Sequence, residues 1–306
     1  MADPDTGEIF LALPPGKDLP FPPLVHLSVA GSHPYAAITD YLNCTFKFSS
    51  SDPIEALFGV LFGVLGVKFA PAIDRQCGFH GYKRSFQLGD SSAIFAIGGQ
   101  AGTAMLSLPG AACAIISDWH ALALYLRDTL KANVTRWDGA VDDYTGSHSV
   151  NDAVELYLNG EFTVGGNMPS CNQHGNWIQP DGSGRTFYVG KRKNGKMLRV
   201  YEKGMQLGGR WHPWVRWEVE LHNKDRIIPW EVLLEPGRFF VGCYPNALSW
   251  AQVEMSKIRT LQKHEGVNQS SWCALTMQLL EDRVCASFDF HHYVQQRTVR
   301  DRGVGR

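Results

Sequence analysis

Thr135-Arg136-Trp137-Asp138-Gly139-Ala140-Val141-Asp142 is the stretch that best predicts the fold, because charged and apolar side chains alternate along it. Residues two positions apart lie on the same face of a β-strand. One face of this segment therefore carries Arg136, Asp138 and Asp142, and the opposite face is apolar. Aspartate is disfavoured in strands, so two aspartates in one strand require an explanation.

Two later segments show the same alternation. In Met197-Leu198-Arg199-Val200-Tyr201-Glu202-Lys203, the side chains of Arg199, Tyr201 and Lys203 share a face, with Glu202 on the other. In Trp217-Glu218-Val219-Glu220-Leu221, the two glutamates share a face and the apolar residues share the other. These segments predict neighbouring strands with one charged face.

The surrounding sequence predicts an α+β fold, a mostly antiparallel central sheet flanked by helices, with a helical C-terminal segment. Strands are predicted over residues 38–48, 82–88, 93–97, 104–108, 134–144 and 214–222, and a hairpin over 186–190 and 196–203 that turns at Asn194-Gly195. A helix is predicted to begin at Pro53, with Asp52 as its N-cap, and to run to Leu65. Further helices are predicted over 118–132, 150–159, 248–264 and 271–282, and a loop over 165–184.

Three regions follow from this order. Residues 1–34 contain seven prolines and predict an extended N-terminal arm. Residues 35–245 hold the predicted sheet. Residues 246–306 predict a helical C-terminal segment whose tail, from Arg297 onward, carries four arginines.

Composition excludes several classes of protein. The chain has 306 residues, of which 44% are hydrophobic and 19% charged, which is ordinary for a globular protein. Its longest apolar run, residues 56–67, is too short for a spanning helix of about 20 residues. The acidic start MADPDTGEIF does not resemble a signal peptide, so a cytoplasmic location is expected. Seven single cysteines without a CxxC pair predict reduced thiols.

The charge is distributed unevenly. The net charge is -1, yet residues 183–210 contain eight basic residues and one acid, Glu202. A local basic patch binds polyanions even when the total charge cancels.

The charged face permits two interpretations. If the strands are neighbours, Asp138, Asp142, Glu218 and Glu220 crowd negative charge, which a bound cation relieves, and oxygen ligands suit Mg²⁺ or Mn²⁺. A phosphate would then lie beside Tyr201. Alternatively, the face is solvated and its charges form cross-strand ion pairs, with Tyr201 as a packing residue.

The three charged segments, together with Arg185-Thr186-Phe187-Tyr188-Val189-Gly190-Lys191-Arg192, resemble the replication initiation factor family. This family includes initiators of rolling-circle plasmids and filamentous phages, and related conjugative relaxases. The resemblance spans about residues 38–245. His222, where Arg or Lys is common, and Pro109 depart from the family pattern.

The resemblance implies a nicking and joining domain over residues 35–245 that cuts one DNA strand at an origin. It assigns the nucleophile to Tyr201, which forms a 5′-phosphotyrosyl bond, and charge stabilisation to Arg199 and Lys203. It implies a Mg²⁺ or Mn²⁺ site made by Asp138, Asp142, Glu218 and, with less weight, Glu220. DNA contacts are expected from Arg185, Lys191, Arg192, Lys193 and Lys196, with Trp211 and Trp214 either stacking on bases or packing in the core.

The implied partners are single-stranded or supercoiled origin DNA and the host replication helicase and polymerase, with no membrane partner; self-association into a homodimer is left open. Three alternatives remain: a relaxase of a conjugative element, a noncatalytic DNA-binding protein with the same fold, and a small-ligand enzyme. No Rossmann or P-loop motif supports the last. The adjacent pair His291-His292 is poorly placed to chelate a metal, because neighbouring strand residues face opposite ways.

Overall fold

The computed structural model describes residues 35–49, 53–209 and 211–251. Its strands are β1 (Ile38–Lys47), β2 (Ala72–Asp74), β3 (Arg84–Leu88), β4 (Ile94–Ile97), β5 (Thr103–Pro109), β6 (Asn133–Asp143), β7 (Cys171–His174), β8 (Thr186–Lys191), β9 (Lys196–Tyr201) and β10 (Val215–His222). The helices are α1 (Ile54–Leu65), α2 (Gly110–Cys113), α3 (Trp119–Leu124), α4 (Val150–Leu158), α5 (Lys203–Gln206) and α6 (Pro236–Cys243), with shorter turns η1 (Val67–Phe69), η2 (Tyr125–Thr129), η3 (Arg192–Asn194), η4 (Trp230–Leu233) and η5 (Ser249–Ala251).

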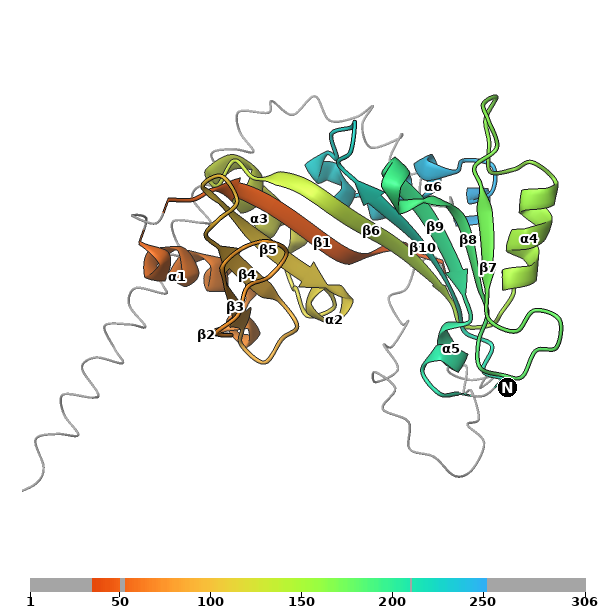
Figure 1. Ribbon diagram of the computed structural model, residues 1–306, viewed down its shortest axis with the longest axis horizontal. Helices are drawn as coiled ribbons and strands as arrows, with labels where there is room; N and C mark the ends of the chain where they lie inside the picture. Colours follow the sequence, from red (N-terminus) through yellow and green to blue (C-terminus); the bar gives the residue numbers. More distant parts are fainter. Residues whose placement is uncertain (1–34, 50–52, 210, 252–306) are drawn as a thin grey trace, which may run out of the picture.

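All ten described strands form one sheet in the order β2-β3-β4-β5-β1-β6-β10-β9-β8-β7. Every described pairing is antiparallel. The long strands β1 and β6 run through the middle and join the end that carries α1 to the end that carries α4 (Figure 1). The predicted α+β fold with an antiparallel sheet is therefore confirmed.

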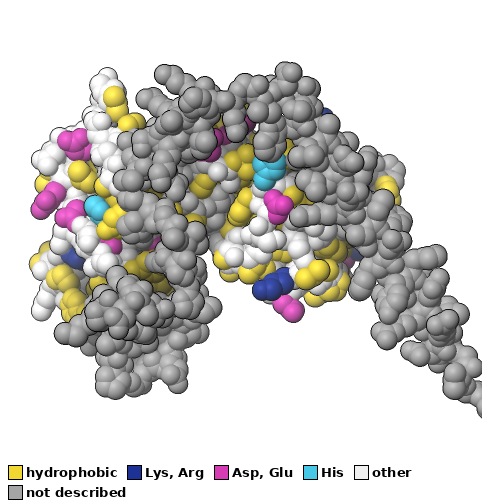
Figure 2. Space-filling view, turned by 180° about the vertical axis from the view of Figure 1, so that it is seen from behind, with side chains coloured by type: hydrophobic (Ala, Val, Ile, Leu, Met, Phe, Trp, Pro, Cys, Tyr) yellow, Lys and Arg dark blue, Asp and Glu magenta, His cyan; other side chains and the backbone are white. Residues whose placement is uncertain are grey.

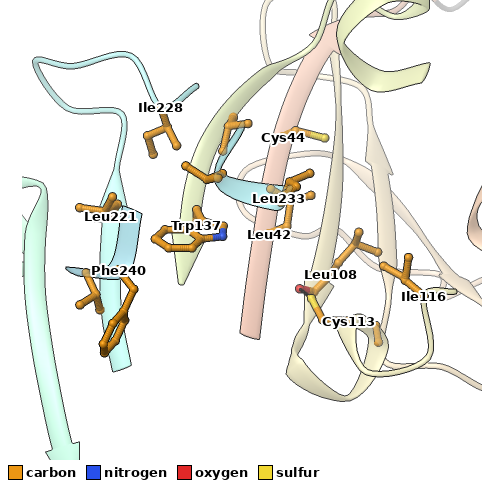
Figure 3. Close-up of a cluster of buried hydrophobic side chains, with 14 of the residues drawn as sticks. Leu42, Cys44, Leu108, Cys113, Ile116, Trp137, Leu221, Ile228, Leu233 and Phe240 are labelled. Carbon is orange, nitrogen blue, oxygen red and sulfur yellow. Dashed lines mark hydrogen bonds between the residues drawn. The ribbon is translucent and has the colours of Figure 1, made fainter. Parts of the chain in front are cut away.

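The core covers the apolar face of the central strands. Trp137 on β6 lies opposite Leu42 on β1 and Leu221 on β10, and all three side chains are buried. Leu233 from η4 and Phe240 from α6 lie in the same cluster (Figure 3). Burying side chains of this size stabilises the fold by about 1.5–3 kcal/mol each. The apolar half of each alternating strand thereby fixes which face turns inward.

At the other end, α1 buries one side against the sheet. Its ring of Phe58 contacts Phe86 on β3 and Phe95 on β4, with centroids 5.3 and 5.2 Å apart. The helix begins at Ile54, after Pro53 as its N-cap, so it starts later than predicted. The residue expected as its cap, Asp52, lies outside the described residues.

Several local predictions require correction. Residues 171–174 form the edge strand β7 within the predicted loop; all four are exposed, so no apolar alternation marked them. Strand β9 ends at Tyr201, and Lys203 begins α5, so Lys203 is not a strand residue. The predicted helix 118–132 divides into α3, which Asp118 caps, and a π-helical turn. The hairpin is present, and its turn includes η3 as well as Gly195 in the left-handed conformation.

Some predicted features fall outside the described residues. These are the arm 1–34, the helices beyond residue 251, the arginine tail, Arg210 and the pair His291-His292. The three-region division stays a prediction. The described cysteines are all free thiols.

No described helix has the length and apolar character needed to cross a lipid bilayer. Seen from behind, the described surface mixes apolar, acidic and basic side chains (Figure 2).

Candidate active site

The predicted charged face exists, and its centre is the end of β9 beside β10. Cross-strand register places Arg199 opposite Glu218 and Tyr201 opposite Arg216. The Tyr201 hydroxyl donates a hydrogen bond to Glu218 Oε2 over 3.0 Å, and Arg199 donates to the other oxygen, Oε1. Tyr201 and Glu218 are only 9% and 2% exposed. The sheet thus holds a phenol, a carboxylate and a guanidinium in fixed contact.

The electrostatic environment favours the protonated phenol. Burial, followed by the negative charge of Glu218, raises the pKa of Tyr201 far above its usual value. The guanidinium groups of Arg216 and Arg199 oppose this shift. Lys203 Nζ lies 5.5 Å from the centroid of the Tyr201 ring, and burial together with the charge of Arg216 lowers its pKa. Tyr201 therefore needs a nearby proton acceptor to act as a nucleophile.

A second group of contacts is centred on Arg216 of β10. Its Nε and Nη2 donate to the two oxygens of Asp142 over 2.7 and 2.6 Å, and its Nη1 donates to Asp40 Oδ1 over 2.7 Å. Trp214 Nε1 also donates to Asp142, over 2.7 Å. Asp40 lies in β1 at a break in register between Thr39 and Tyr41. One guanidinium therefore joins strands β1, β6 and β10.

A third group is centred on Glu220. Arg136 binds Asp138 through Nε over 2.8 Å and reaches Glu220 Oε2 over 3.2 Å. Arg192 Nη2 donates to the same oxygen over 3.0 Å, and the His222 ring bonds Oε1. Burial alone would raise the pKa of Glu220, but the bonds from His222 and Arg192 and the charge of Arg136 lower it to about 2. Burial raises the pKa of Asp138 to about 7, against the effect of Arg136.

The four predicted metal ligands do not surround one position. Asp138 and Asp142 are four residues apart on one strand, which separates them by about 13 Å. Both oxygens of each carboxylate are engaged: Asp138 by Arg136, Asp142 by Arg216, and the two glutamates as described above. Within the described residues, no group of three or more His, Cys, Asp or Glu side chains is arranged to hold a metal ion. In this arrangement the carboxylates do not fit Mg²⁺ or Mn²⁺.

The predicted DNA-binding residues divide into two sets. Lys191, Arg192 and Lys193 are exposed at the end of the hairpin. Lys196 faces the other side of the sheet, where its Nζ donates to the Cys243 carbonyl over 2.7 Å and lies 4.1 Å from the Tyr244 ring centroid. Lys196 is therefore engaged within the protein, and its DNA contact stays a prediction.

Arg185 is also engaged within the protein. Its guanidinium binds Glu202 and lies 5.0 Å from the centroid of Trp177. Glu202 thus lies away from the charged face, as predicted, and holds the base of the hairpin through Arg185. Trp214 is buried, which decides between its two predicted roles in favour of packing, whereas Trp211 is 57% exposed.

Sequence reasoning missed Asp40 and Arg216 as site residues. Arg216 stands two positions before Glu218, so alternation alone places it on the charged face. Asp40 carries no comparable signal, because the register break that turns it toward Arg216 is a property of the assembled sheet. Lys224 and Arg226 were also missed; they donate to the carbonyls of Lys193 and Asn194 and so add basic charge at the hairpin.

Comparison with known proteins shows a similar family and a similar fold. The family model described as replication initiation factor matches residues 132–281, which include β6 to β10. A solved structure, that of a rolling circle replication initiator protein from Geobacillus stearothermophilus, is similar with a TM-score of 0.56 and 22% identity, covering 69% of this chain and 85% of that one. No curated protein matches. At that identity the structural likeness supports the fold, while the family match covers every predicted catalytic and metal-binding residue. The chain is therefore similar to the replication initiation factor family over residues 132–281, just under half of its length.

Proposed function

We propose that the protein initiates rolling-circle DNA replication by cutting and rejoining one strand at an origin, with Tyr201 as the nucleophile. The observation that carries this proposal is the hydrogen bond between the Tyr201 hydroxyl and Glu218, which also accepts a bond from Arg199. The family match to residues 132–281 supports it. The same geometry serves a conjugative relaxase equally well, because the chemistry is shared.

The reaction assigns a role to each of these three side chains. The Tyr201 oxygen attacks the scissile phosphorus and its proton passes to Glu218 Oε2, which lies within the reach required of a general base. The bond from phosphorus to the 3′ oxygen breaks, and that oxygen takes up a proton to become a free 3′-OH. The product is a 5′-phosphotyrosyl ester, which stores the bond energy for rejoining.

Nearby cations suit a developing phosphate charge. Arg199 and Lys203 flank the Tyr201 ring, with distances of 5.9 and 5.5 Å from the ring centroid to the guanidinium carbon and to Nζ. Fixed donors of this kind stabilise a transition state most when they are held in place before reaction. The ion pair with Glu218 holds Arg199 in place in this way. The same contact therefore positions both the proposed base, Glu218, and the proposed charge-stabilising group, Arg199.

The metal expectation stays a separate proposal. Mg²⁺ or Mn²⁺ would bind Asp138, Asp142, Glu218 or Glu220 only after arginine side chains release those oxygens, and no step above uses an ion. The partners are proposed as origin DNA and, after nicking, the host helicase and polymerase. A noncatalytic DNA-binding protein with this fold is the second candidate, favoured by the arginine-paired carboxylates.

A covalent-adduct assay separates these possibilities. The purified protein is incubated with supercoiled DNA carrying the origin of its own replicon, with Mg²⁺, Mn²⁺ or EDTA, and separated on a denaturing gel. We expect an adduct with the wild type and with Tyr144→Phe, a matched tyrosine at the end of the same face, and none with Tyr201→Phe. An adduct that persists in Tyr201→Phe would place the nucleophile elsewhere, and none with any protein would favour the noncatalytic candidate.

A further inference from the structure

A pocket opens on the charged face beyond Arg199, and the mechanism does not use it. Its volume is about 270 Å³, and its walls include Asn172 from β7, Tyr188 from β8 and Met197 from β9, with Lys191 and Arg192 at its edge. Tyr188 lies directly opposite Arg199 in the register of β8 and β9. The pocket and the proposed nucleophile therefore belong to one continuous surface.

We propose that this pocket binds one unpaired nucleobase of the strand that Tyr201 cuts. The inference rests on the proposed function, since it assumes that single-stranded DNA runs along this face. The volume is below the range of about 300–1,000 Å³ that is usual for drug-sized ligands, which suits a single planar ring system. None of the described residues that line it is acidic, so nothing there repels a polyanion.

The side chains match the chemistry of a base. Tyr188 offers an aromatic ring for stacking, which every base accepts and which contributes about 1–3 kcal/mol. Asn172 carries an amide, the group that pairs with the donor and acceptor on one edge of a base. Its oxygen already accepts a bond from the Gln173 backbone, and its amide nitrogen carries two N–H donors for a base. Met197 supplies an apolar wall and is 8% exposed.

The position also fits a strand that passes over Tyr201. Met197 precedes Tyr201 by four residues on the same face of β9, so the pocket lies about 13 Å from the phenol. Single-stranded DNA covers that distance with about two to four nucleotides, depending on how far it is extended. Arg192 lies between the pocket and the carboxylates, because its guanidinium reaches Glu220. Together with Lys191 it meets the phosphates of such a strand.

The test measures binding of fluorescently labelled single-stranded oligo-dT and oligo-dA by anisotropy, with no cutting required. We expect Tyr188→Leu to weaken binding about 5- to 150-fold, the range for the loss of one stacking contact of about 1–3 kcal/mol. Tyr188→Phe keeps the ring and binds within about twofold of the wild type. Asn172→Ala changes the ratio of the two affinities severalfold, whereas Gln173→Ala, its exposed neighbour on the edge strand, does not.

Salt titration distinguishes stacking from charge. Tyr188→Leu should leave the slope of log affinity against log salt unchanged, while Lys191→Met should reduce its magnitude by about 0.7, the value for one phosphate on a single strand. Tyr188→Leu with wild-type affinity, or equal losses in Tyr188→Leu and Tyr188→Phe, would overturn the proposal, as would an unchanged base preference in Asn172→Ala. Asn172 is exposed on an edge strand, so Asn172→Ala should fold normally. This variant therefore tests the pocket even if Tyr188→Leu fails to fold.

The binding measurements test the pocket, and the adduct assay tests the proposed nicking function, so either proposal can fail without the other. If these affinities change as expected but the wild type forms no covalent adduct, the pocket stands and the nicking proposal fails. If the adduct forms and the affinities do not change, the pocket proposal fails alone.

Discussion

Trp217 and Glu218 are consecutive residues of β10 and are buried to nearly the same degree, 0% and 2% exposed, yet they lie on opposite faces of the sheet. Trp217 packs among apolar groups and donates its one N–H to the His148 carbonyl over 2.9 Å. Glu218 is held by Arg199 and Tyr201. Burial therefore does not distinguish core from site here. What distinguishes them is whether apolar contact or paired charge compensates for the loss of water.

The difference has a consequence for the site. Carboxylates and guanidinium groups buried together cost more to separate than surface pairs do, so each group is fixed in position by its partner. The Tyr201 hydroxyl is thereby aimed at Glu218 before any substrate binds, which is the condition for efficient proton transfer. The apolar face supplies most of the stability, and in the proposed mechanism the charged face supplies the chemistry.

The largest expected effect separates the two faces directly. Trp217→Ala should lower the free energy of unfolding by about 3–5 kcal/mol, because a large buried ring leaves a cavity. The protein that remains folded should form adducts at near the wild-type rate. Tyr201→Phe should do the reverse, abolishing adducts while costing about 1 kcal/mol for one hydrogen bond. Urea unfolding and the adduct assay measure both; a folded Trp217→Ala protein without adducts would show that the faces are not independent.

A somewhat smaller effect is expected at Glu220, which lies on β10 two residues after Glu218. Glu220 has a folded pKa of about 2 against an ordinary value of 4.5, so its carboxylate stabilises the fold above about pH 4.5 and this stabilisation is lost as the pH falls toward 2. Glu220→Gln should cost about 3 kcal/mol at pH 7, by leaving arginine partners unpaired.

The deficit of Glu220→Gln should shrink when unfolding is measured between pH 7 and pH 3. Glu155→Gln, an exposed residue of α4, serves as the control and should change stability little at any pH. A deficit that stays constant down to pH 3 would mean that packing, and not charge, holds Glu220.

The sequence alone could predict which side chains share a face, because strand alternation depends only on parity. It placed Tyr201, Glu218 and Asp138 on one face correctly. It could not predict that arginines occupy the carboxylates, since a pattern of alternating charge is equally compatible with a metal site. The contact between Asp40 and Arg216 could not be predicted from local alternation, because 176 residues separate the two along the chain. The edge strand β7 was missed because exposed polar residues carry no apolar period.

A smaller effect is expected from a substitution at Gly139, the glycine within β6. A Cβ atom built on Gly139 would lie 2.3 Å from Cη2 of the fully buried Trp137 ring, so Gly139→Ala must displace that ring. Overpacking of this kind costs about 1–3 kcal/mol. Gly59→Ala is the matched control, because no atom lies within 4 Å of its Cβ and alanine favours the helix α1. Thermal unfolding should show a loss for the first variant and a small gain for the second; equal values would mean that Trp137 can move at little cost.

The smallest expected effect lies at the surface. Lys193 is exposed at the hairpin, and within the described part of the chain its backbone carbonyl accepts a bond from Lys224 while its side chain makes no hydrogen bond or ion pair. Lys193→Met should therefore leave stability within about 0.5 kcal/mol and weaken single-stranded DNA binding a fewfold, with the salt slope reduced by about 0.7. Lys68→Met, at an exposed lysine near α1, is the control and should change neither quantity. Equal losses in both variants would mean that DNA responds to total charge alone, whereas a loss confined to Lys193 would place the bound DNA strand at the hairpin.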